Sequence, residues 1–223
     1  MADPITYEQQ GNTALIVLDD GKANAFGFDF IETFNSELDH AEKDSKAVAI
    51  IGRPGLLSGG FDLAVIQGGD QDVLSRLVNS GARLMMRLYG HPQPLIVGAT
   101  GHAVALGAFM LLSADYRIGT SGDFKIGLNE TAIGLTLPKF GIALAQDRIS
   151  RRKLAQATLG ATLYDPDNAL DIGYIDELAA PDNLRDTVLA RANKMAELDG
   201  PAFAASKENL RGSTIRQVLA GLG

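Results

Sequence analysis

The sequence predicts an α/β protein with a helical C-terminal part, and three observations lead to that fold class. Segments with the patterns of strands and of helices alternate over the first two thirds of the chain. Residues 47–51 form a continuous apolar run of the kind that is buried on both faces of a sheet. Helical patterns dominate residues 184–198 and 201–219. We therefore expect a core domain at residues 1–180 and a helical region at residues 181–223.

Composition and charge narrow the classes of function. The chain has 223 residues, of which 46% are hydrophobic and 21% charged, enough apolar material for a sizeable core. A net charge of −7 argues against general binding to nucleic acid or to an anionic membrane surface. The absence of cysteine excludes thiolate metal sites, and three widely spaced histidines give no metal-binding signature. No secretory leader is visible after Met1, and the longest apolar run, residues 103–112, is too short to span a bilayer. We expect a soluble, cytoplasmic protein without a metal site.

The first half of the chain is predicted to hold a hairpin, a buried strand and three helices. Phe30, Phe34 and Leu38 recur at helical spacing, and Pro92 breaks the last of the three helices. The predicted elements are strands at 5–9, 13–18 and 47–51, a loop at 52–60, and helices at 28–43, 62–67 and 71–89.

The stretch at residues 101–115, GHAVALGAFMLLSAD, is the most informative one. A predicted strand at 94–99 precedes it, so the pattern indicates a strand, a glycine turn and a buried helix. A helix that begins inside a protein directs unpaired backbone N–H groups at whatever lies in front of it, which suits a negatively charged ligand oxygen. A core helix behind a tight glycine turn explains the same pattern, and it is the commoner arrangement.

The second half is predicted to pass from short strands to helices. Asp165 followed by Pro166 is typical of a helix start, and Gly173 of a helix end. The predicted elements are strands at 116–119 and 124–127 around a turn at 120–123, a loop or short helix at 128–137, helices at 138–149, 151–159 and 165–173, a strand at 174–179, and the two C-terminal helices.

Five segments occur in the order in which similar segments occur in the crotonase superfamily of enoyl-CoA hydratases and isomerases, which the chain resembles over nearly its whole length. They are residues 22–25 (KANA), 57–63 (LSGGFDL), 101–115, 128–135 (LNETAIGL) and 169–177 (ALDIGYIDE). The resemblance implies a spiral of stacked ββα units, an acyl-CoA thioester as substrate, and no metal or redox cofactor. It also implies a homotrimer or homohexamer in which residues 181–223 serve assembly.

The resemblance assigns roles to individual residues. The backbone amides of Phe61 and Leu106 would donate hydrogen bonds to the thioester oxygen, each worth on the order of 3 kcal/mol in the transition state by analogy with other oxyanion holes. Glu130 would be the base, because apolar neighbours bury its carboxylate and raise its pKa. Without the resemblance, a surface glycine turn and an exposed loop glutamate would explain the same residues. The residues that would contact CoA or the acyl group are Ala23, Asn24, Ala25, Gly59, Gly60, Asp62, Leu63, Gly107 and Phe109.

Phe109 is a departure from the hydratases of this superfamily. Hydratases use two glutamates, and the position of one of them falls on Phe109, which can neither hold water nor pass a proton. A single glutamate suffices to move a proton between C2 and C4 of one substrate. The sequence around Glu130 is also similar to the Δ3,Δ2-enoyl-CoA isomerases. The leading hypothesis is therefore isomerisation of 3-enoyl-CoA to 2-enoyl-CoA; the alternatives are hydration with a bound water in place of one acid, and a non-catalytic acyl-CoA-binding protein.

Other polar residues have weaker claims to a role. His102 is expected to be a packed, hydrogen-bonded residue more often than a ligand contact, and Asp115 to be structural. Lys207 and Arg211 lie four apart on the last helix, where a solvated helix face is a simpler explanation than contact with CoA phosphates. Family members usually carry a further C-terminal helix over the acyl pocket, so this sequence implies either a more open pocket or a shortened chain. Apolar residues that suit subunit packing are Val188, Leu189, Met195, Phe203 and Leu210.

Overall fold

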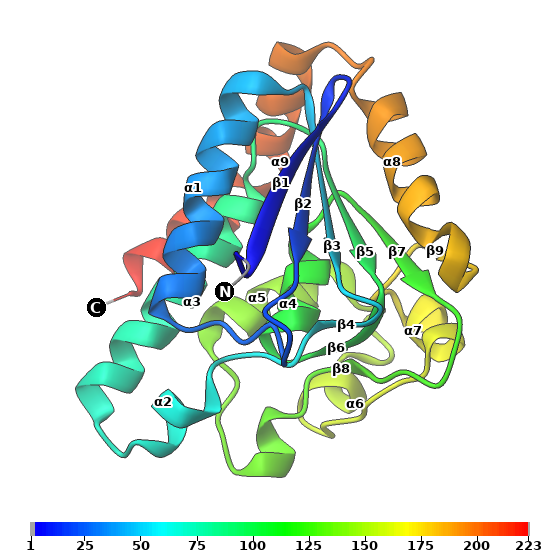
Figure 1. The fold of residues 1–223 in the computed structure, drawn as a ribbon. Coiled ribbons are helices and arrows are strands. Elements are labelled where there is room, and N and C mark those ends of the chain that lie inside the picture. Colours follow the sequence, from blue (N-terminus) through cyan, green and yellow to red (C-terminus); the bar gives the residue numbers. More distant parts are fainter. Residues whose placement is uncertain (1–2, 223) are drawn as a thin grey trace.

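Two sheets, one large and one small, organise the chain (Figure 1). The computed structural model describes residues 3–222, so Met1, Ala2 and Gly223 lie outside the described residues. The prediction about a secretory leader concerns a stretch that begins at these undescribed N-terminal residues. In the large sheet, the first two strands form an antiparallel hairpin and every later pairing is parallel. Its strands, in spatial order, are β1 (Ile5–Gln10), β2 (Thr13–Leu18), β3 (Ala47–Gly52), β5 (Leu95–Ala99), β7 (Tyr116–Thr120) and β9 (Glu177–Ala179). The small parallel sheet contains β4 (Gly55–Ser58), β6 (Gly101–Val104) and β8 (Ile126–Gly127).

The two sheets are linked strand by strand. β3 leads into β4, β5 into β6, and β7 into β8, so the order 3-5-7 of the large sheet is repeated as 4-6-8 in the small one. Helices follow each of these strand pairs, with α3 (Gln71–Tyr89) after β4, α4 (Leu106–Ser113) after β6 and α5 (Lys139–Arg148) after β8. This arrangement is a spiral of stacked ββα units, and it confirms the predicted fold class.

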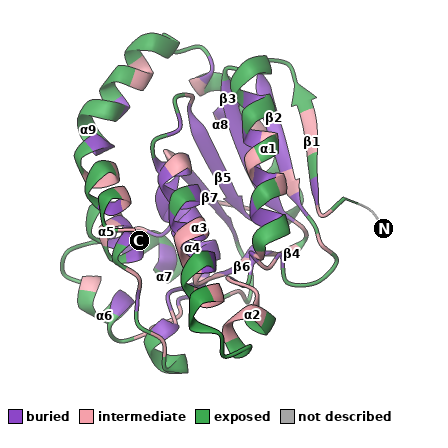
Figure 2. Cartoon of the chain, turned by 90° about the vertical axis from the view of Figure 1, so that its left-hand side faces the viewer, coloured by how far each residue is buried: buried purple, intermediate pink, exposed green. Residues whose placement is uncertain are grey.

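Alternating side chains of the large sheet face two helical layers. Ile16, Ile50 and Val97 belong to an apolar cluster with α1 (Phe28–Asp44), α3 and α4. Residues one position away along the same strands, such as Ala49, belong to a second cluster with α8 (Leu184–Met195). Figure 2 shows the buried strands between these layers. The other helices are α2 (Leu63–Gln67), α6 (Leu154–Thr158), α7 (Pro166–Ile172), α9 (Gly200–Ala220) and the short 3-10 helices Glu130–Ile133 and Pro181–Asn183.

Most predicted elements are confirmed, but the small sheet was largely missed. Residues 52–60 contain β4 rather than a loop alone, and the predicted glycine turn at residue 101 is strand β6. Gly101 allows close approach of these two strands, because a Cβ atom at residue 101 would lie 2.0 Å from the carbonyl oxygen of Gly55. The strands predicted at 116–119 and 124–127 exist as β7 and β8, but they belong to different sheets. The predicted strand at 174–179 is reduced to β9.

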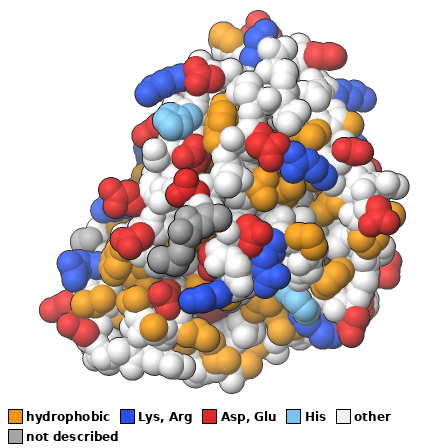
Figure 3. Space-filling model, in the orientation of Figure 1, with side chains coloured by type: hydrophobic (Ala, Val, Ile, Leu, Met, Phe, Trp, Pro, Cys, Tyr) orange, Lys and Arg blue, Asp and Glu red, His pale blue; other side chains and the backbone are white. Residues whose placement is uncertain are grey.

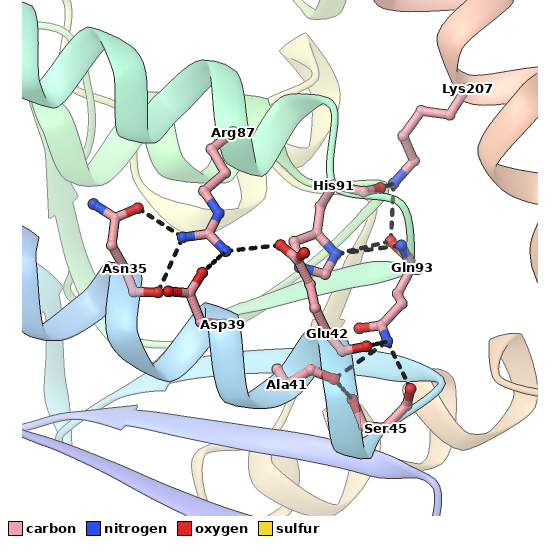
Figure 4. A network of polar contacts seen from close by, with 9 residues as sticks. All are labelled: Asn35, Asp39, Ala41, Glu42, Ser45, Arg87, His91, Gln93 and Lys207. Atoms are coloured by element: carbon pink, nitrogen blue, oxygen red, sulfur yellow. Dashed lines mark hydrogen bonds and ion pairs between the residues drawn. The ribbon is translucent and has the colours of Figure 1, made fainter.

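The loop after α3 ties three helices together (Figure 4). The side-chain amide of Gln93 donates to carbonyl groups at the C-terminal end of α1, the shortest of these contacts being 2.6 Å to the oxygen of Ser45. Lys207 of α9 donates to the carbonyl oxygens of His91 and Gln93 at 2.6 and 3.0 Å. Arg87 of α3 pairs with Asp39 of α1 at 2.6 Å. α9 is therefore anchored to the body of the domain by polar contacts as well as by packing.

Lys207 and Arg211 correct a prediction. Both side chains are buried and form ion pairs with the carboxylate of Asp115, at 2.6 and 2.9 Å. They form neither a solvated helix face nor an open phosphate site. Helical spacing placed them on one face of α9, but that face packs against the loop after α4. Asp115 is structural, as predicted.

The C-terminal helices belong to the packing of this chain. α8 packs on β3, β5 and β7, and Val188 is fully buried there. The prediction that Val188 suits subunit packing is therefore wrong, because this residue packs within the chain. α9 packs across α3 and α5, and its Leu210 is 76% exposed. The division at residue 180 and the assembly role of the last region stay predictions.

The molecular surface carries both acidic and basic side chains. Acidic and basic side chains are intermixed on the face drawn in Figure 3. Within residues 3–222, no helix combines the length and the apolar character needed to cross a membrane.

Candidate active site

The first predicted amide donor, Phe61, lies in the loop after β4. Its two neighbours are paired with Phe26: the amide of Phe26 donates to Gly60 at 2.9 Å, and the amide of Asp62 donates to Phe26 at 3.2 Å. Successive amides of an extended chain point to opposite sides, so the amide of Phe61 faces away from Phe26. Among the hydrogen bonds of residues 3–222 it has no acceptor. Gly60 permits this loop because its φ is +109°.

The second predicted donor, Leu106, is the first residue of α4. Its amide is one of the N-terminal helix amides without an intrahelical acceptor, and within the described chain no other acceptor is found for it. The two loops meet here, because a Cβ atom at Gly60 would lie 3.6 Å from the amide nitrogen of Leu106. Gly107 faces β4, where a Cβ atom would lie 2.5 Å from the carbonyl oxygen of Ser58. Both glycines therefore allow contacts that a side chain would prevent.

Ala105 precedes Leu106 in a strained conformation. Its φ of 52° and ψ of −118° lie outside the regions that L-amino acids favour, which costs about 1–3 kcal/mol. The conformation turns the chain from β6 into α4. Sequence reasoning did not identify this residue, because a backbone outlier at alanine has no signature in the sequence.

The loop at residues 20–25 is fastened against the first donor loop. The carboxylate of Asp20 accepts hydrogen bonds from the amides of Lys22, Asn24 and Ala25. Asn24 is fully buried, and its side chain donates to the carbonyl oxygens at the ends of β2 and β4. Ala23 accepts from the amide of Gly59 at 2.9 Å. The side chain of Asn24 and most backbone groups of residues 23–25 therefore already have partners within the protein.

Glu130, the predicted base, begins the 3-10 helix that follows β8. Its side chain is buried, and burial raises the pKa of its carboxyl above the ordinary value. The nearby backbone N–H groups of Glu130 and Asn129 favour the charged carboxylate and oppose this rise in pKa. The oxygen Oε2 is buried without a hydrogen-bond partner. A carboxylate held in this way has one oxygen free to take up a proton, and its raised pKa makes it a stronger base than an exposed carboxylate.

A cavity of about 560 Å³ joins two of the three predicted catalytic residues, Phe61 and Glu130, whereas Leu106 lies beside its lining residue Ala105 but does not line it. It is lined by the predicted site residues Gly59, Phe61, Leu63, Phe109 and Glu130. Glu130 is the only ionisable side chain among the described residues that line it. Residues missed by sequence reasoning also line it: Ile66, Gln71, Leu74, Val78, Ala105, Asn129, Ile133, Leu135, Thr136 and Pro138. Asn129 could have been found from its place beside Glu130 in the matched segment.

Phe109 supplies an apolar wall of the cavity. The residue is 1% exposed, and its ring packs edge-on against the ring of Phe140 at a centroid distance of 5.2 Å. On α5, Gly141 makes room for it, because a Cβ atom there would lie 2.3 Å from the ring. The ring is thus fixed by packing.

Several predicted residues lie outside the cavity lining. Asp62 accepts the amide of Ala64 at 2.9 Å and caps α2. His102 accepts the amide of Lys125 at 3.0 Å, which is the packed role expected for it. Ala23, Asn24, Ala25, Gly60 and Gly107 do not line the cavity either.

Comparison with known proteins identifies the family. The profile of the enoyl-CoA hydratase/isomerase family matches residues 8–221. The chain belongs to this family. The resemblance inferred from the five segments is therefore confirmed.

Relatives of this family member carry both names. It is 26% identical to rat mitochondrial enoyl-CoA delta isomerase 1, over 94% of this chain and 75% of the relative. It is 31% identical to a probable enoyl-CoA hydratase of Mycobacterium avium, over 74% of this chain and 63% of the relative. The family therefore gives an acyl-CoA enzyme without deciding between the two reactions.

Solved structures agree with the fold. An enoyl-CoA hydratase/isomerase family protein from Pseudomonas syringae superposes with a TM-score of 0.96 at 39% identity, covering 99% of this chain and 95% of that one. A protein from Mycobacterium tuberculosis, described as an enoyl-CoA isomerase in one structure and as a probable enoyl-CoA hydratase in another, gives TM-scores of 0.94 and 0.95 at 34% identity, covering 100% and 97% in the first and 99% and 93% in the second. Human mitochondrial delta3-delta2-enoyl-CoA isomerase gives 0.94 at 23% identity, covering 98% and 87%, which is evidence for the fold alone.

Proposed function

We propose that this protein isomerises 3-enoyl-CoA thioesters to 2-enoyl-CoA thioesters. The observation that carries the proposal is Glu130, a buried carboxylate with an unpaired oxygen and the only ionisable group among the described residues of the cavity lining. One carboxylate is sufficient for a reaction that takes a proton from one carbon and returns it to another on the same substrate.

The proposed reaction has two proton transfers. Glu130 removes a proton from C2, and the electron pair moves into the thioester to form an enolate. The amides of Phe61 and Leu106 donate to the enolate oxygen, and the positive end of α4 adds to this stabilisation. The protonated Glu130 then delivers its proton to C4 while the double bond moves from C3–C4 to C2–C3. No metal or redox cofactor takes part in this scheme.

The remaining predicted residues have binding roles in the proposal. Backbone groups of Ala23, Asn24 and Ala25 contact the CoA portion, beside Gly59 and Asp62. Gly60 and Gly107 keep the two donor loops close, and Leu63 and Phe109 bound the acyl group. Assembly into a homotrimer or homohexamer and a cytoplasmic location also stay proposals.

The test compares two substrates and two variants. Purified protein is assayed with 3-hexenoyl-CoA for double-bond migration and with 2-hexenoyl-CoA for water addition. Glu130→Gln is expected to reduce kcat for isomerisation by about 10²–10⁴-fold, the range for loss of a general base, while hexanoyl-CoA still binds. Glu32→Gln, an exposed substitution on α1, serves as the matched control and should retain activity.

Three outcomes contradict the proposal. Faster hydration than isomerisation would favour the hydratase alternative, which the name of the M. avium relative supports. Unchanged turnover in Glu130→Gln would remove the role of the base. Binding of hexanoyl-CoA without turnover of either substrate would indicate a non-catalytic acyl-CoA-binding protein.

A further inference from the structure

Ala105 is a non-glycine residue in a conformation suited to glycine. In residues 3–222, positive φ angles at residues other than glycine occur at Asn24, Ala105 and Ala161. With a φ of 52° and a ψ of −118°, Ala105 also lies outside the left-handed helical region. Glycine adopts this conformation without a steric penalty. The backbone conformation at residue 105 would therefore have a lower energy with glycine than with alanine.

Contacts on both sides fix the direction of this methyl group. The amide of Ala105 donates to Gly127 of β8 at 3.0 Å, and its carbonyl oxygen accepts from Phe109 of α4 at 3.0 Å. Since both backbone groups are paired with regular elements, the peptide on either side cannot rotate freely. The Cβ atom is consequently held in one orientation.

Ala105 and the two residues that follow it differ in their relation to the proposed catalytic cavity. Ala105 lines the cavity, whereas Leu106 is fully buried in the core and Gly107 has no side chain. A Cβ atom at Gly60 would lie 3.0 Å from the Cβ atom of Ala105. The methyl group thus faces Gly60, in the loop that carries the amide of Phe61.

We infer that Ala105 is a specificity-determining residue that restricts the site to acyl-CoA thioesters without a substituent on C2. This inference rests on the proposed function, because it places the thioester oxygen at the two amides and C2 within reach of Glu130. The C1–C2 bond then passes beside Ala105. A methyl group on C2 and the methyl group of Ala105 compete for the same volume, and a packed wall with paired backbone groups does not yield to make room.

The experiment measures a ratio of substrates. The value of kcat/KM is determined for 3-hexenoyl-CoA and for its 2-methyl derivative, and dissociation constants are measured by calorimetry for hexanoyl-CoA and 2-methylhexanoyl-CoA. We expect the wild type to prefer the unbranched compounds by about 10–200-fold, the range for one methyl group in a pocket. Ala105→Gly is expected to reduce that preference at least about tenfold. Ala105→Ser, which keeps the bulk, should retain the preference and covers the case in which the glycine variant fails to fold.

Ala161→Gly is the matched control. Ala161 is another alanine with positive φ, at 46°, but it does not line the cavity. Relief of strain alone would change stability in both glycine variants, whereas only Ala105→Gly should change the substrate ratio. Equal binding of branched and unbranched thioesters by the wild type, or the same ratio in Ala105→Gly and wild type, would overturn the inference.

The binding arm separates this inference from the proposed function. If the protein isomerises 3-hexenoyl-CoA but shows no preference in binding, the inference fails and the proposed function stands. If the preference is present in binding while no isomerisation occurs, the proposed function fails and the steric role of Ala105 stands. If neither thioester binds, both fail.

Discussion

The substitution Asp115→Asn tests how α9 is held to the domain. The carboxylate of Asp115 accepts from Lys207 at 2.6 Å, from Arg211 at 2.9 Å and from the amide of Leu95 at 2.8 Å. The three charged side chains are only 5–8% exposed. Replacing the acid by its neutral isostere therefore leaves two buried cations without a counter-charge.

The expected loss of stability follows from the contacts that remain. Removing one partner of a buried ion pair costs about 3–5 kcal/mol. The asparagine still offers an acceptor to Leu95, and Lys207 keeps two carbonyl acceptors. Arg211 keeps the carbonyl oxygen of Tyr89 and lies 4.4 Å from the centre of that ring. We therefore expect the lower end, about 3 kcal/mol. Asp115→Ala should lose roughly 1–3 kcal/mol more, because the amide of Leu95 is then unpaired.

Equilibrium unfolding in urea, followed by circular dichroism, measures this loss. The urea concentration at the midpoint of unfolding should fall, while the slope of the free energy of unfolding against urea concentration should stay unchanged. Glu208→Gln is the matched control, because it removes an ion pair with Arg216 that is 59% and 70% exposed and should cost at most about 1 kcal/mol. A loss below about 1 kcal/mol in Asp115→Asn would refute the reasoning that this cluster stabilises the position of α9.

Three further predictions concern pH, the base and metal. Burial lowers the pKa of Lys207 from 10.5 to about 8. Between these two pH values the unfolded chain binds a proton at Lys207 that the folded protein does not bind. The free energy of unfolding should therefore rise with pH by about 1.4 kcal/mol per pH unit because of this group. Urea midpoints from pH 7 to 10 should show this rise, and Lys207→Met should lack it; a rise of equal size in the variant would contradict the assignment. Burial raises the pKa of Glu130, so the folded protein keeps this proton to a higher pH than the unfolded chain. The melting temperature of Glu130→Gln minus that of the wild type should therefore increase as pH rises through the raised pKa. A difference that decreases with rising pH would contradict the conclusion that burial raises the pKa of this carboxyl. Dialysis against EDTA should leave kcat/KM unchanged, because the proposed proton transfers use only Glu130 and backbone amides; loss of activity that Mg²⁺ or Zn²⁺ restores would contradict that scheme.

The large sheet and the long helices could be predicted because their patterns are local. The apolar residues of α1 recur at helical spacing, and Asp165 with Pro166 marks the start of α7. β4 and β6 could not be predicted, because strands of four residues that contain glycine show neither alternation nor a long apolar run. Their pairing depends on the stacking of the ββα units.

The residues of the candidate site could be predicted where a sequence motif includes them. They could not be predicted where their role depends on backbone conformation. Glu130 and Phe109 were assigned from the matched segments, and both line the cavity. The strain at Ala105 depends on how β6 enters α4, which no residue type specifies. The burial of Lys207 was also hidden, because its partner Asp115 lies 92 positions away in the chain.

The strain at Ala105 persists because α4 is fixed at its other end. Arg148 donates to the carbonyl oxygens of Leu112 and Ala114, and the next residue, Asp115, is held by its buried ion pairs. The backbone at Ala105 could relax only if α4 moved, and that movement would disturb these contacts. The strain amounts to about 1–3 kcal/mol, whereas loss of a buried ion-pair partner costs about 3–5 kcal/mol. Because breaking the ion pairs costs more than the strain, α4 stays in place, and as a result the amide of Leu106, unpaired among the described residues, keeps its position at the start of the helix.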